Sequence, residues 1–334
     1  MDLNTLLKHT SRSLYLSVKI LPPSIRPAFG LAYLLCRYAD TIADTSLLPA
    51  DQRIYAIQLF PQIVSSGQIP QPDKIQSAFT GTSENPYERD LLTHLPDCLR
   101  ALHAIPAAQQ PFIYEVVEAV CEGMKIDLMK FSEISPSTPR AFALDTDLTH
   151  YCRLMGGKPG LFWSKLIFHA HMALLPKETF YDLGQQVGDA LQIVNILRDL
   201  PRDLRSGRCY FPQTDLEKAG LTAAELLNSS QSCKFNPVKI KWIRWGKQNL
   251  ENAVPYYKAI SKRHWRVRAA VAWPLLWTAD TFVKLARTPN LLDPAKRVKI
   301  SRPRVYATML VTPLLLFSNT LFEKWLSHKL NKLP

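Results

Sequence analysis

Apolar residues recur every three or four positions through most of the 334-residue chain, which is the spacing of one face of an α-helix. No stretch shows the sustained alternation of a half-buried strand, and glycine and proline fall mainly between the helical segments. The pattern therefore predicts an all-α protein. The expected helices cover residues 3–20, 26–43, 111–130, 148–169 with an interruption at 156–160, a segment that contains 192–199, and most of the chain from there to about 286.

Polar stretches rich in proline, serine, glycine or glutamine separate these segments, at 46–51, 61–85 and 132–146, and a basic loop is expected at 205–212. No repeat of solenoid length is present. We predict a single all-helical domain over residues 1–334 around a central cavity. Pro201 is expected to kink or end the helix in which it lies.

The C-terminal stretch 305–322 is apolar but is interrupted by threonine, proline, serine and asparagine. It is barely long enough to span a bilayer, and a buried helix gives the same signal. A packed or interfacial helix is therefore favoured over a span, and 305–334 is expected to be a membrane-proximal C-terminal segment. The tail 324–329 could contact anionic lipid.

The charge balance is strongly basic, with 41 Lys and Arg against 28 Asp and Glu, a net charge of +13. Such an excess favours anionic partners: nucleic acid, an acidic membrane surface or phosphorylated small molecules. Six cysteines stand without any Cys-x-x-Cys pair, which argues against a zinc site and a disulfide framework. The first residues show no signal-peptide pattern. We expect a cytoplasmic protein with at most peripheral contact at the inner face of the membrane, and a monomer is compatible with the sequence.

Two acidic motifs carry the candidate chemistry. Asp40 and Asp44 stand four residues apart, as do Asp199 and Asp203, so on a helix each pair projects from one face. Arg37 and Arg198 lie beside them, and Asn195 extends the second pair by one more turn. Carboxylate and amide oxygens suit Mg²⁺, and arginine suits phosphate, so each motif is interpreted as a diphosphate site.

A single Asp-x-x-x-Asp is usually only a solvated helix face, and the adjacent arginines leave structural ion pairs open as an alternative. Both pairs have apolar neighbours, which argues for burial and hence for a counter-ion. The glycine-rich segment 156–160 matches neither a P-loop nor a dinucleotide fingerprint, so a helix break or a close helix contact is favoured. Tyr151 could equally be a core aromatic. The basic runs 262–268 and 296–299 are interpreted as solvated faces.

Six groups of residues, in one order along the chain, resemble a known set of motifs. They are Ser11, Arg12 and Ser13; Tyr33, Arg37, Asp40 and Asp44; Glu122 and Asp127; Tyr151 with Gly156 and Gly157; Gln192, Asn195, Arg198, Asp199 and Asp203; and Arg208, Tyr210 and Pro212. Together they resemble the squalene/phytoene synthase family, the head-to-head trans-isoprenyl diphosphate synthases. The resemblance implies an isoprenoid-synthase-type helical bundle around a central cavity.

Within that family the chain looks most like squalene synthases. Residues 39–44, 272–281 and 298–302 resemble their first motif, their proline- and threonine-bearing helix, and the segment that they place against NADPH. Ala43, Arg202 and Ser301 depart from the family's pattern, the first two by removing a carboxylate each and the third by replacing an arginine. The number of metal ions at each motif is therefore open.

The resemblance implies a prenyltransferase that condenses two farnesyl diphosphates to presqualene diphosphate with Mg²⁺, or Mn²⁺, and then reduces it to squalene with NADPH. It implies metal binding by Asp40, Asp44, Asn195, Asp199 and Asp203, and proton removal or diphosphate hydrogen bonding by Tyr151. The implied substrate-binding residues are Ser11, Arg12, Ser13, Tyr33, Arg37, Gln192, Arg198, Arg208 and Tyr210. The implied cofactor-binding residues are Arg12, Arg37, Arg198, Lys299 and Arg302.

Two alternatives stay open. The first is an enzyme of the same family that omits the reduction and makes phytoene, dehydrosqualene or presqualene diphosphate. The second is a basic helical protein that binds nucleic acid or membrane. Only the net charge supports the second, and charge alone does not explain two aspartate motifs, so no nucleic-acid partner is expected.

Overall fold

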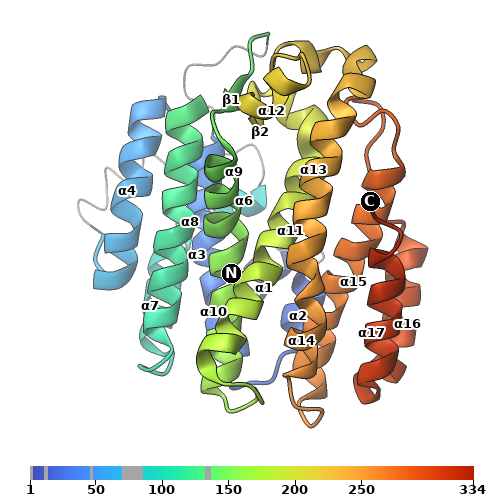
Figure 1. Cartoon of the computed structure of the whole chain (residues 1–334). Helices are drawn as coiled ribbons and strands as arrows, with labels where there is room; N and C mark the ends of the chain where they lie inside the picture. The colour runs from blue at the N-terminus through green and yellow to red at the C-terminus, as the bar shows by residue number, and fades with distance from the viewer. Residues whose placement is uncertain (1–2, 11–13, 46–47, 70–85, 132–136) are drawn as a thin grey trace. The chain divides into compact units, whose positions relative to one another are not determined.

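The computed structural model describes residues 3–10, 14–45, 48–69, 86–131 and 137–334. Within these ranges nearly every element is a helix, and the only strands are the short β1 (Arg140–Phe142) and β2 (Arg208–Pro212) (Figure 1). The predicted all-α class is confirmed. The chain divides into two compact units, one of Met1–Ser132 with Lys165–His171 and one of Glu133–Ser164 with Met172–Pro334. The two acidic motifs belong to different units, so the single domain around a central cavity stays a prediction.

The first unit is built on α3, α4 and α8, which pack against one another. The stacked rings of Tyr38 on α3 and Phe60 on α4, 5.0 Å apart, belong to this core. The long helices α3 and α8 confirm the predictions at 26–43 and 111–130, whereas the helix expected at 3–20 is present as α1 and α2. The helices of this unit are α1 (Leu3–Thr10), α2 (Leu14–Ile20), α3 (Arg26–Asp44), α4 (Ala50–Ser66), α6 (Pro86–Thr93), α7 (Leu95–His103) and α8 (Gln110–Phe131).

The second unit is organised around α11 (Lys177–Arg205), which packs against α13 (Ser232–Glu251) and α15 (Trp265–Arg287). Glu178 in the first turn and Arg202 and Arg205 in the last complement the helix dipole. The helix does not end at Pro201. Gly246 allows α13 to pack closely against α15, because a Cβ at this position would lie 2.4 Å from Cζ of Phe282 on α15.

Shorter elements complete the second unit. The strands β1 (Arg140–Phe142) and β2 (Arg208–Pro212) pair in parallel, so the prediction of a loop throughout 205–212 is wrong over β2. The segment predicted as a helix with an interruption is α9 (Asp145–Cys152), a π-helix over Arg153–Gly157, and α10 (Lys158–His169), whose residues from Lys165 onward belong to the first unit. Residues after β2 form α12 (Gln213–Lys218), two 3₁₀ turns and, after α13, the short helix α14 (Ala253–Lys258).

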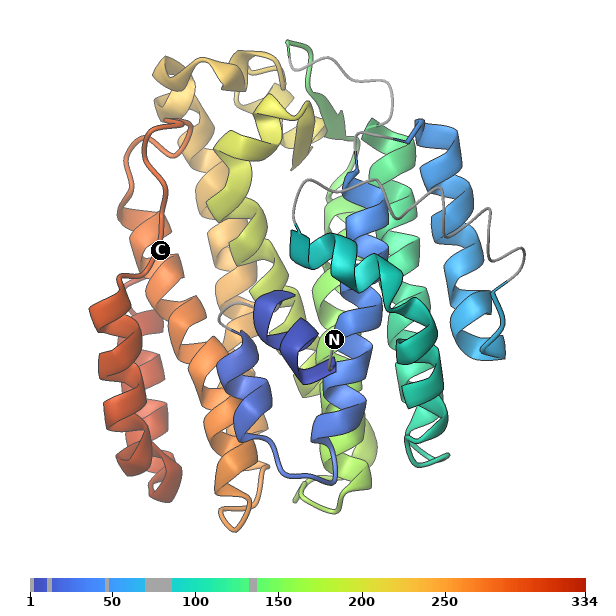
Figure 2. The same ribbon diagram turned by 180° about the vertical axis from the view of Figure 1, so that it is seen from behind.

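The C-terminal helices α16 (Arg302–Phe317) and α17 (Asn319–Leu330) pack side by side with α15 at one edge of the second unit (Figures 1 and 2). Buried Asp280 on α15 binds both of them, through Arg304 Nε at 2.6 Å and Lys329 Nζ at 2.6 Å. In the described part of the chain no helix is both long and apolar enough to cross a membrane.

Candidate active site

The first acidic motif lies on α3 in the first unit. The Tyr33 hydroxyl donates to the carbonyl of Thr10 at 2.9 Å, and Arg37 forms an ion pair with Asp40 one turn away. Asp40 is half-buried, but Asp44 is exposed. The apolar residues around Asp44 in the sequence belong to the buried face of the helix, so the expectation that they imply a buried carboxylate is wrong there. Ser11, Arg12 and Ser13 lie outside the described residues.

The second motif lies on α11 in the second unit. Gln192, Asn195 and Asp199 follow each other at three- and four-residue steps and are all half-buried, while the apolar residues between them are fully buried. Asn195, Asp199 and Asp203, which were predicted at successive turns of one helix, all lie on α11, and Gln192 precedes them on the same side. Asp203, one turn beyond Asp199, is only 9% exposed.

The two carboxyl groups of this motif have opposite pKa shifts. Burial raises the pKa of Asp199, but the hydrogen bond and charge of Arg198, with the charges of Arg202 and Arg297, outweigh it and hold that pKa below its usual value. Burial raises the pKa of Asp203 to about 6. Repulsion from Asp199 adds to this increase, and Arg202 and Arg208 only partly oppose it.

Four arginines thus act on two carboxylates within one unit. Arg198 lies 2.6 Å from Asp199 and Arg202 lies 3.3 Å from Asp203, while Arg208 and Arg297 act through their charge. The guanidinium groups outnumber the carboxylates by two, so the cluster attracts anions. A bridging polyanion such as diphosphate would bind to the arginines, which present planar forks of donors.

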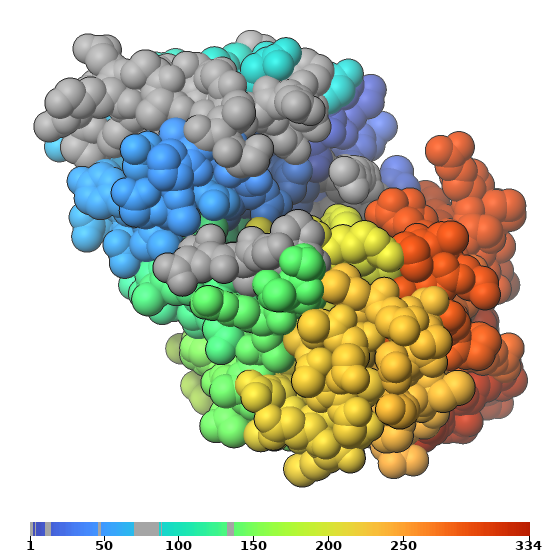
Figure 3. All heavy atoms as spheres, turned by 90° about the horizontal axis from the view of Figure 1, so that it is seen from above, coloured from blue at the N-terminus to red at the C-terminus, as the bar shows by residue number. Residues whose placement is uncertain are grey.

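Sequence reasoning missed Arg297, which was interpreted as part of a solvated basic face. It is exposed, and it comes from the loop between α15 and α16, about a hundred residues from Asp199 along the chain. This orange-to-red loop segment lies at the surface (Figure 3). Lys299 and Arg302, predicted to bind cofactor, are also exposed and follow directly. The only signal available in the sequence was the position of Arg297 two residues before Lys299.

Tyr151 and Tyr210, both singled out from the sequence, are brought together by the fold. Their rings stack with centroids 5.0 Å apart, and Phe142 on β1 lies 5.7 Å from each of them. Both tyrosines are buried. The β1–β2 pair places this aromatic cluster, and β2 carries Arg208 as well as Tyr210, so the aromatic faces and the arginine-rich cluster share an element.

The glycine-rich segment is a close helix contact, one of the two readings favoured for it. A Cβ on Gly156 would lie 2.3 Å from the carbonyl oxygen of Gly188 and 2.6 Å from Cβ of Gln192. A Cβ on Gly188 would lie 2.1 Å from the carbonyl oxygen of Gly156. The π-helix therefore meets α11 backbone to backbone, directly beside Gln192. Short π-helical segments of this kind are frequent at functional sites.

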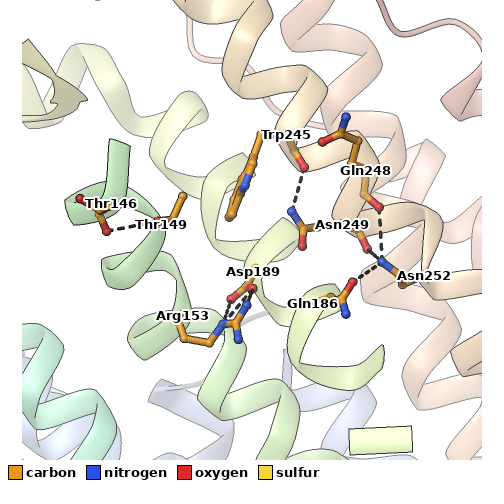
Figure 4. Close-up of polar contacts among 9 residues, drawn as sticks. All are labelled: Thr146, Thr149, Arg153, Gln186, Asp189, Trp245, Gln248, Asn249 and Asn252. Atoms are coloured by element: carbon orange, nitrogen blue, oxygen red, sulfur yellow. Dashed lines mark hydrogen bonds and ion pairs between the residues drawn. The ribbon is translucent and has the colours of Figure 1, made fainter. Parts of the chain in front are cut away.

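An ion pair between Arg153 and Asp189 bridges the same contact and was not anticipated (Figure 4). Arg153 Nη2 lies 2.7 Å from Asp189 Oδ2, and Arg153 Nε lies 3.0 Å from the same oxygen. The Asp189 side chain is 1% exposed, whereas that of Arg153 is 39% exposed. Burial raises the pKa of Asp189 to about 6 even though Arg153 acts against the increase. On another side of α11, Asn252 Nδ2 donates to Gln186 Oε1 at 2.7 Å.

Replacing Arg153 by methionine is expected to lower the free energy of unfolding by about 3–5 kcal/mol at pH 7.5, because it leaves the Asp189 carboxylate buried without its partner. The raised pKa of Asp189 in the folded state means that this group's contribution to stability falls as the pH rises from about 4 to about 6. The defect of Arg153→Met should accordingly shrink at pH 5, where the carboxyl group binds a proton. Urea unfolding at the two pH values measures both effects.

The double variant Arg153→Met/Asp189→Asn provides the control. It removes the charge as well as its partner and should recover most of the lost stability at pH 7.5. A single Arg153→Met variant as stable as the wild type at pH 7.5 would show that the pair does not hold the π-helix on α11.

The donor chemistry of the two motifs fits a divalent cation together with diphosphate. Among the described residues no group of three or more His, Cys, Asp or Glu side chains could hold a metal. Each motif offers two carboxylates and the second adds the Asn195 amide, which are oxygen ligands of the kind that Mg²⁺ completes with water and phosphate. A cation beside Asp203 would also offset the cost of its burial and of its repulsion from Asp199.

Comparison with known families places these motifs in context. The sequence model of the family described as "Squalene/phytoene synthase" matches residues 7–304. A bifunctional lycopene cyclase/phytoene synthase of Phaeosphaeria nodorum is 26% identical over 84% of this chain and 44% of its own length. Phytoene synthase 2 of Solanum lycopersicum is 25% identical over 91% of this chain and 88% of its own. The chain thus spans less than half of the first of these relatives.

Solved structures share the fold at lower identity. A complex of TcSQS with a ligand superimposes with a TM-score of 0.78 at 18% identity and covers 99% of this chain and 96% of that one. A dehydrosqualene synthase has a TM-score of 0.65 at 17% identity, over 94% and 95% of the two chains. Squalene synthase HpnC from Alicyclobacillus acidocaldarius has a TM-score of 0.60 at 18% identity, over 86% and 92%.

Proposed function

Because the chain belongs to the squalene/phytoene synthase family, we propose that it condenses two molecules of farnesyl diphosphate to presqualene diphosphate and reduces this to squalene. The observation that carries the diphosphate chemistry is the cluster of Arg198, Arg202, Arg208 and Arg297 acting on Asp199 and Asp203. An anion-attracting cluster that retains two carboxylates can take a diphosphate together with a cation.

The preference for squalene is supported by the basic segment near the C-terminus. Residues 298–302 resemble the segment that squalene synthases place against NADPH, and Arg297, the residue before it, acts on the pKa of Asp199. A cationic segment beside the second acidic motif is where a phosphate-bearing cofactor would be held during a reduction that follows ionisation. The first motif, residues 39–44, supports the same preference.

The acidic and basic side chains have separate tasks in this mechanism. Arg198 holds Asp199 ionised in the ligand-free protein, and its fork can turn to a phosphate oxygen when diphosphate arrives. Arg37 has the same relation to Asp40 in the first unit. Mg²⁺, when bound by Asp40 and Asp44 or by Asn195, Asp199 and Asp203, would neutralise the departing diphosphate.

The aromatic cluster would stabilise the allylic cation that forms when the diphosphate leaves. Tyr151 and Tyr210 present ring faces from a buried position, where a carbocation is stabilised by the ring quadrupole and shielded from water. The Tyr151 hydroxyl would accept the proton lost when the cyclopropane ring closes while it passes its own proton to the released diphosphate, or it would donate a hydrogen bond to the diphosphate. NADPH, when held by Lys299 and Arg302 with Arg12, Arg37 or Arg198 as further phosphate ligands, would supply the hydride for the second half-reaction.

A second candidate is an enzyme that joins two prenyl diphosphates without reduction. It is favoured by the two sequence relatives described above, a bifunctional lycopene cyclase/phytoene synthase at 26% identity and a phytoene synthase at 25%. The two candidates differ in chain length of substrate and in the need for NADPH, so one set of incubations separates them.

Labelled farnesyl diphosphate incubated with the protein and Mg²⁺ is expected to give presqualene diphosphate without NADPH and squalene with it, as measured by gas chromatography with mass spectrometry. The variant Lys299→Gln should lower squalene output several-fold and accumulate presqualene diphosphate, whereas Lys262→Gln, in a basic run outside the site, should behave like the wild type. Dehydrosqualene or presqualene diphosphate as the final product despite NADPH, or a preference for geranylgeranyl diphosphate, would establish the second candidate instead.

A further inference from the structure

Helix α16 buries two threonines together with Leu315 and Leu316, and leaves several of its large apolar side chains exposed. Thr308 and Thr312 are buried against the unit, and Trp273 Nε1 on α15 donates to Thr312 Oγ1 at 2.9 Å. Leu310, Leu314 and Phe317 are 80%, 64% and 70% exposed. In water the favoured arrangement is the reverse, with leucine and phenylalanine buried and threonine outside. The threonines that interrupt this segment in the sequence are thus part of its inward face.

Most of the outward residues lie on one face of α16. Leu310, Leu314 and Phe317 follow at steps of four and three, the spacing of one helical face, and Leu321 lies just past the end of this helix, in the first turn of α17. Tyr306 and Val311 flank this face and are also exposed. These six residues make up half of the twelve large apolar residues exposed on the described chain. An apolar patch of this kind marks an interaction surface. We refer to the six residues as the α16 stripe.

The stripe is rigidly mounted on the second unit. Asp280 binds Arg304 and Lys329, Arg268 Nη2 donates to Asn319 Oδ1 at 2.6 Å, and Tyr257 donates to the carbonyl of Leu315 at 3.2 Å. These contacts hold the inner side of the hairpin, so the outward position of the leucines is determined by packing and does not reflect a loosely attached helix.

The charge around the stripe is positive. Residues 291–334 contain eight Lys and Arg against two acids, Asp293 and Glu323, so this short segment holds +6 of the net +13. Glu323 is already paired with Lys258 at 2.7 Å. Exposed Arg302 lies at the start of α16, exposed Lys324 lies on α17, and exposed Lys332 follows the end of α17. Cations at both ends of an apolar face suit the negative surface of an anionic bilayer.

We propose that the α16 stripe docks the protein on the surface of an anionic lipid bilayer, with α16 lying in the plane of the membrane. The 16 residues of α16 extend roughly 24 Å, less than the thickness of the hydrocarbon core, and the helix ends at Ser318, which caps α17. The leucines and Phe317 enter the acyl boundary, and Lys324 and Lys332 contact the headgroups. This inference does not depend on the proposed reaction.

Co-sedimentation of the full chain with vesicles tests the proposal. Wild-type protein is expected to bind vesicles of phosphatidylcholine with phosphatidylglycerol, and to bind pure phosphatidylcholine more weakly. The variant Leu310→Ser/Leu314→Ser/Phe317→Ser should lose about tenfold or more of its partition coefficient. A matched control, Tyr55→Ser/Met129→Ser/Leu174→Ser, changes three side chains of similar exposure, 66%, 60% and 67%, elsewhere on the surface and should bind like the wild type.

A separate variant tests how much the lysine charges contribute to vesicle binding. Lys324→Gln/Lys332→Gln should lose about fivefold or more on the anionic vesicles and be unaffected on phosphatidylcholine alone, whereas Lys218→Gln/Lys234→Gln, two exposed lysines away from the stripe, should change nothing. Far-ultraviolet circular dichroism checks that each variant is folded, which is expected because the replaced side chains are exposed.

Three results would overturn the proposal: wild-type protein that does not bind the anionic vesicles, a triple serine variant that binds them unchanged, or lysine variants with undiminished binding. Sedimentation equilibrium tests the other possible partner of the α16 stripe, a second copy of this chain. A wild-type dimer that the triple serine variant converts to a monomer, with no effect on vesicle binding, would assign the stripe to a second copy of this chain.

Discussion

Replacement of Asp199 by alanine is expected to abolish Mg²⁺-dependent release of diphosphate, a loss of about 10³-fold or more in kcat if the carboxylate contributes several kcal/mol to charge stabilisation. Asp199 is the better placed carboxylate of its motif, because Arg198, Arg202 and Arg297 keep it ionised while Asp203 is held at a raised pKa. Asp203→Ala should therefore retain more activity than Asp199→Ala. A phosphate-coupled assay with farnesyl diphosphate measures both.

The matched control for this experiment is Asp182→Ala, which removes an exposed aspartate from the same helix and should leave the rate unchanged. Thermal unfolding of each variant separates loss of chemistry from loss of fold. An Asp199→Ala enzyme with wild-type activity would refute the metal assignment of the whole 195–203 segment, since no other described carboxylate of that motif is ionised as readily.

The parts of this structure that depend on local patterns could be predicted from the sequence. The helical period located α3, α8 and the helix that bears Asp199, and the four-residue steps between Asn195, Asp199 and Asp203 predicted that all three lie on that helix, α11. The glycines at 156 and 157 favoured a close contact, and it is present. In each case residues a few positions apart determine the result, so the information is local.

What could not be predicted depends on pairs that are distant along the chain. Arg153 and Asp189 are 36 residues apart, and nothing near either of them indicates the other. Arg297 acts on Asp199 from a loop almost a hundred residues away, so its basic run looked like an ordinary solvated face. The inward threonines of α16 were taken for interruptions, because a sequence does not reveal which side of a helix its neighbours will cover. Strand β2 was missed since a five-residue strand shows too little alternation.

The contact between the π-helix and α11 leads to the largest effect expected on stability. Gly188→Ala would place a Cβ 2.1 Å from the carbonyl oxygen and 2.7 Å from the carbonyl carbon of Gly156, and 3.0 Å from Cα of Gly157. All three are backbone atoms, so no side-chain rotation can relieve the overlap and the two helices must separate. We expect the free energy of unfolding to fall by about 3 kcal/mol or more, at the upper end of overpacking effects.

Gly30→Ala is the control that isolates this effect from the general consequence of adding a methyl group to a helical glycine. Its Cβ would meet only the mobile Cδ2 of Leu7 at 3.2 Å, and alanine is favoured over glycine inside a helix by about 1 kcal/mol, so its stability should be unchanged or slightly higher. Urea unfolding compares the two. Because Gln192 lies against Gly156, separation of the helices also displaces the second acidic motif, and Gly188→Ala should lose diphosphate release even at temperatures where it remains folded. Equal unfolding midpoints for Gly188→Ala and the wild type would contradict the backbone contact between the π-helix and α11. They would also contradict the explanation that this contact requires glycine at positions 156 and 188.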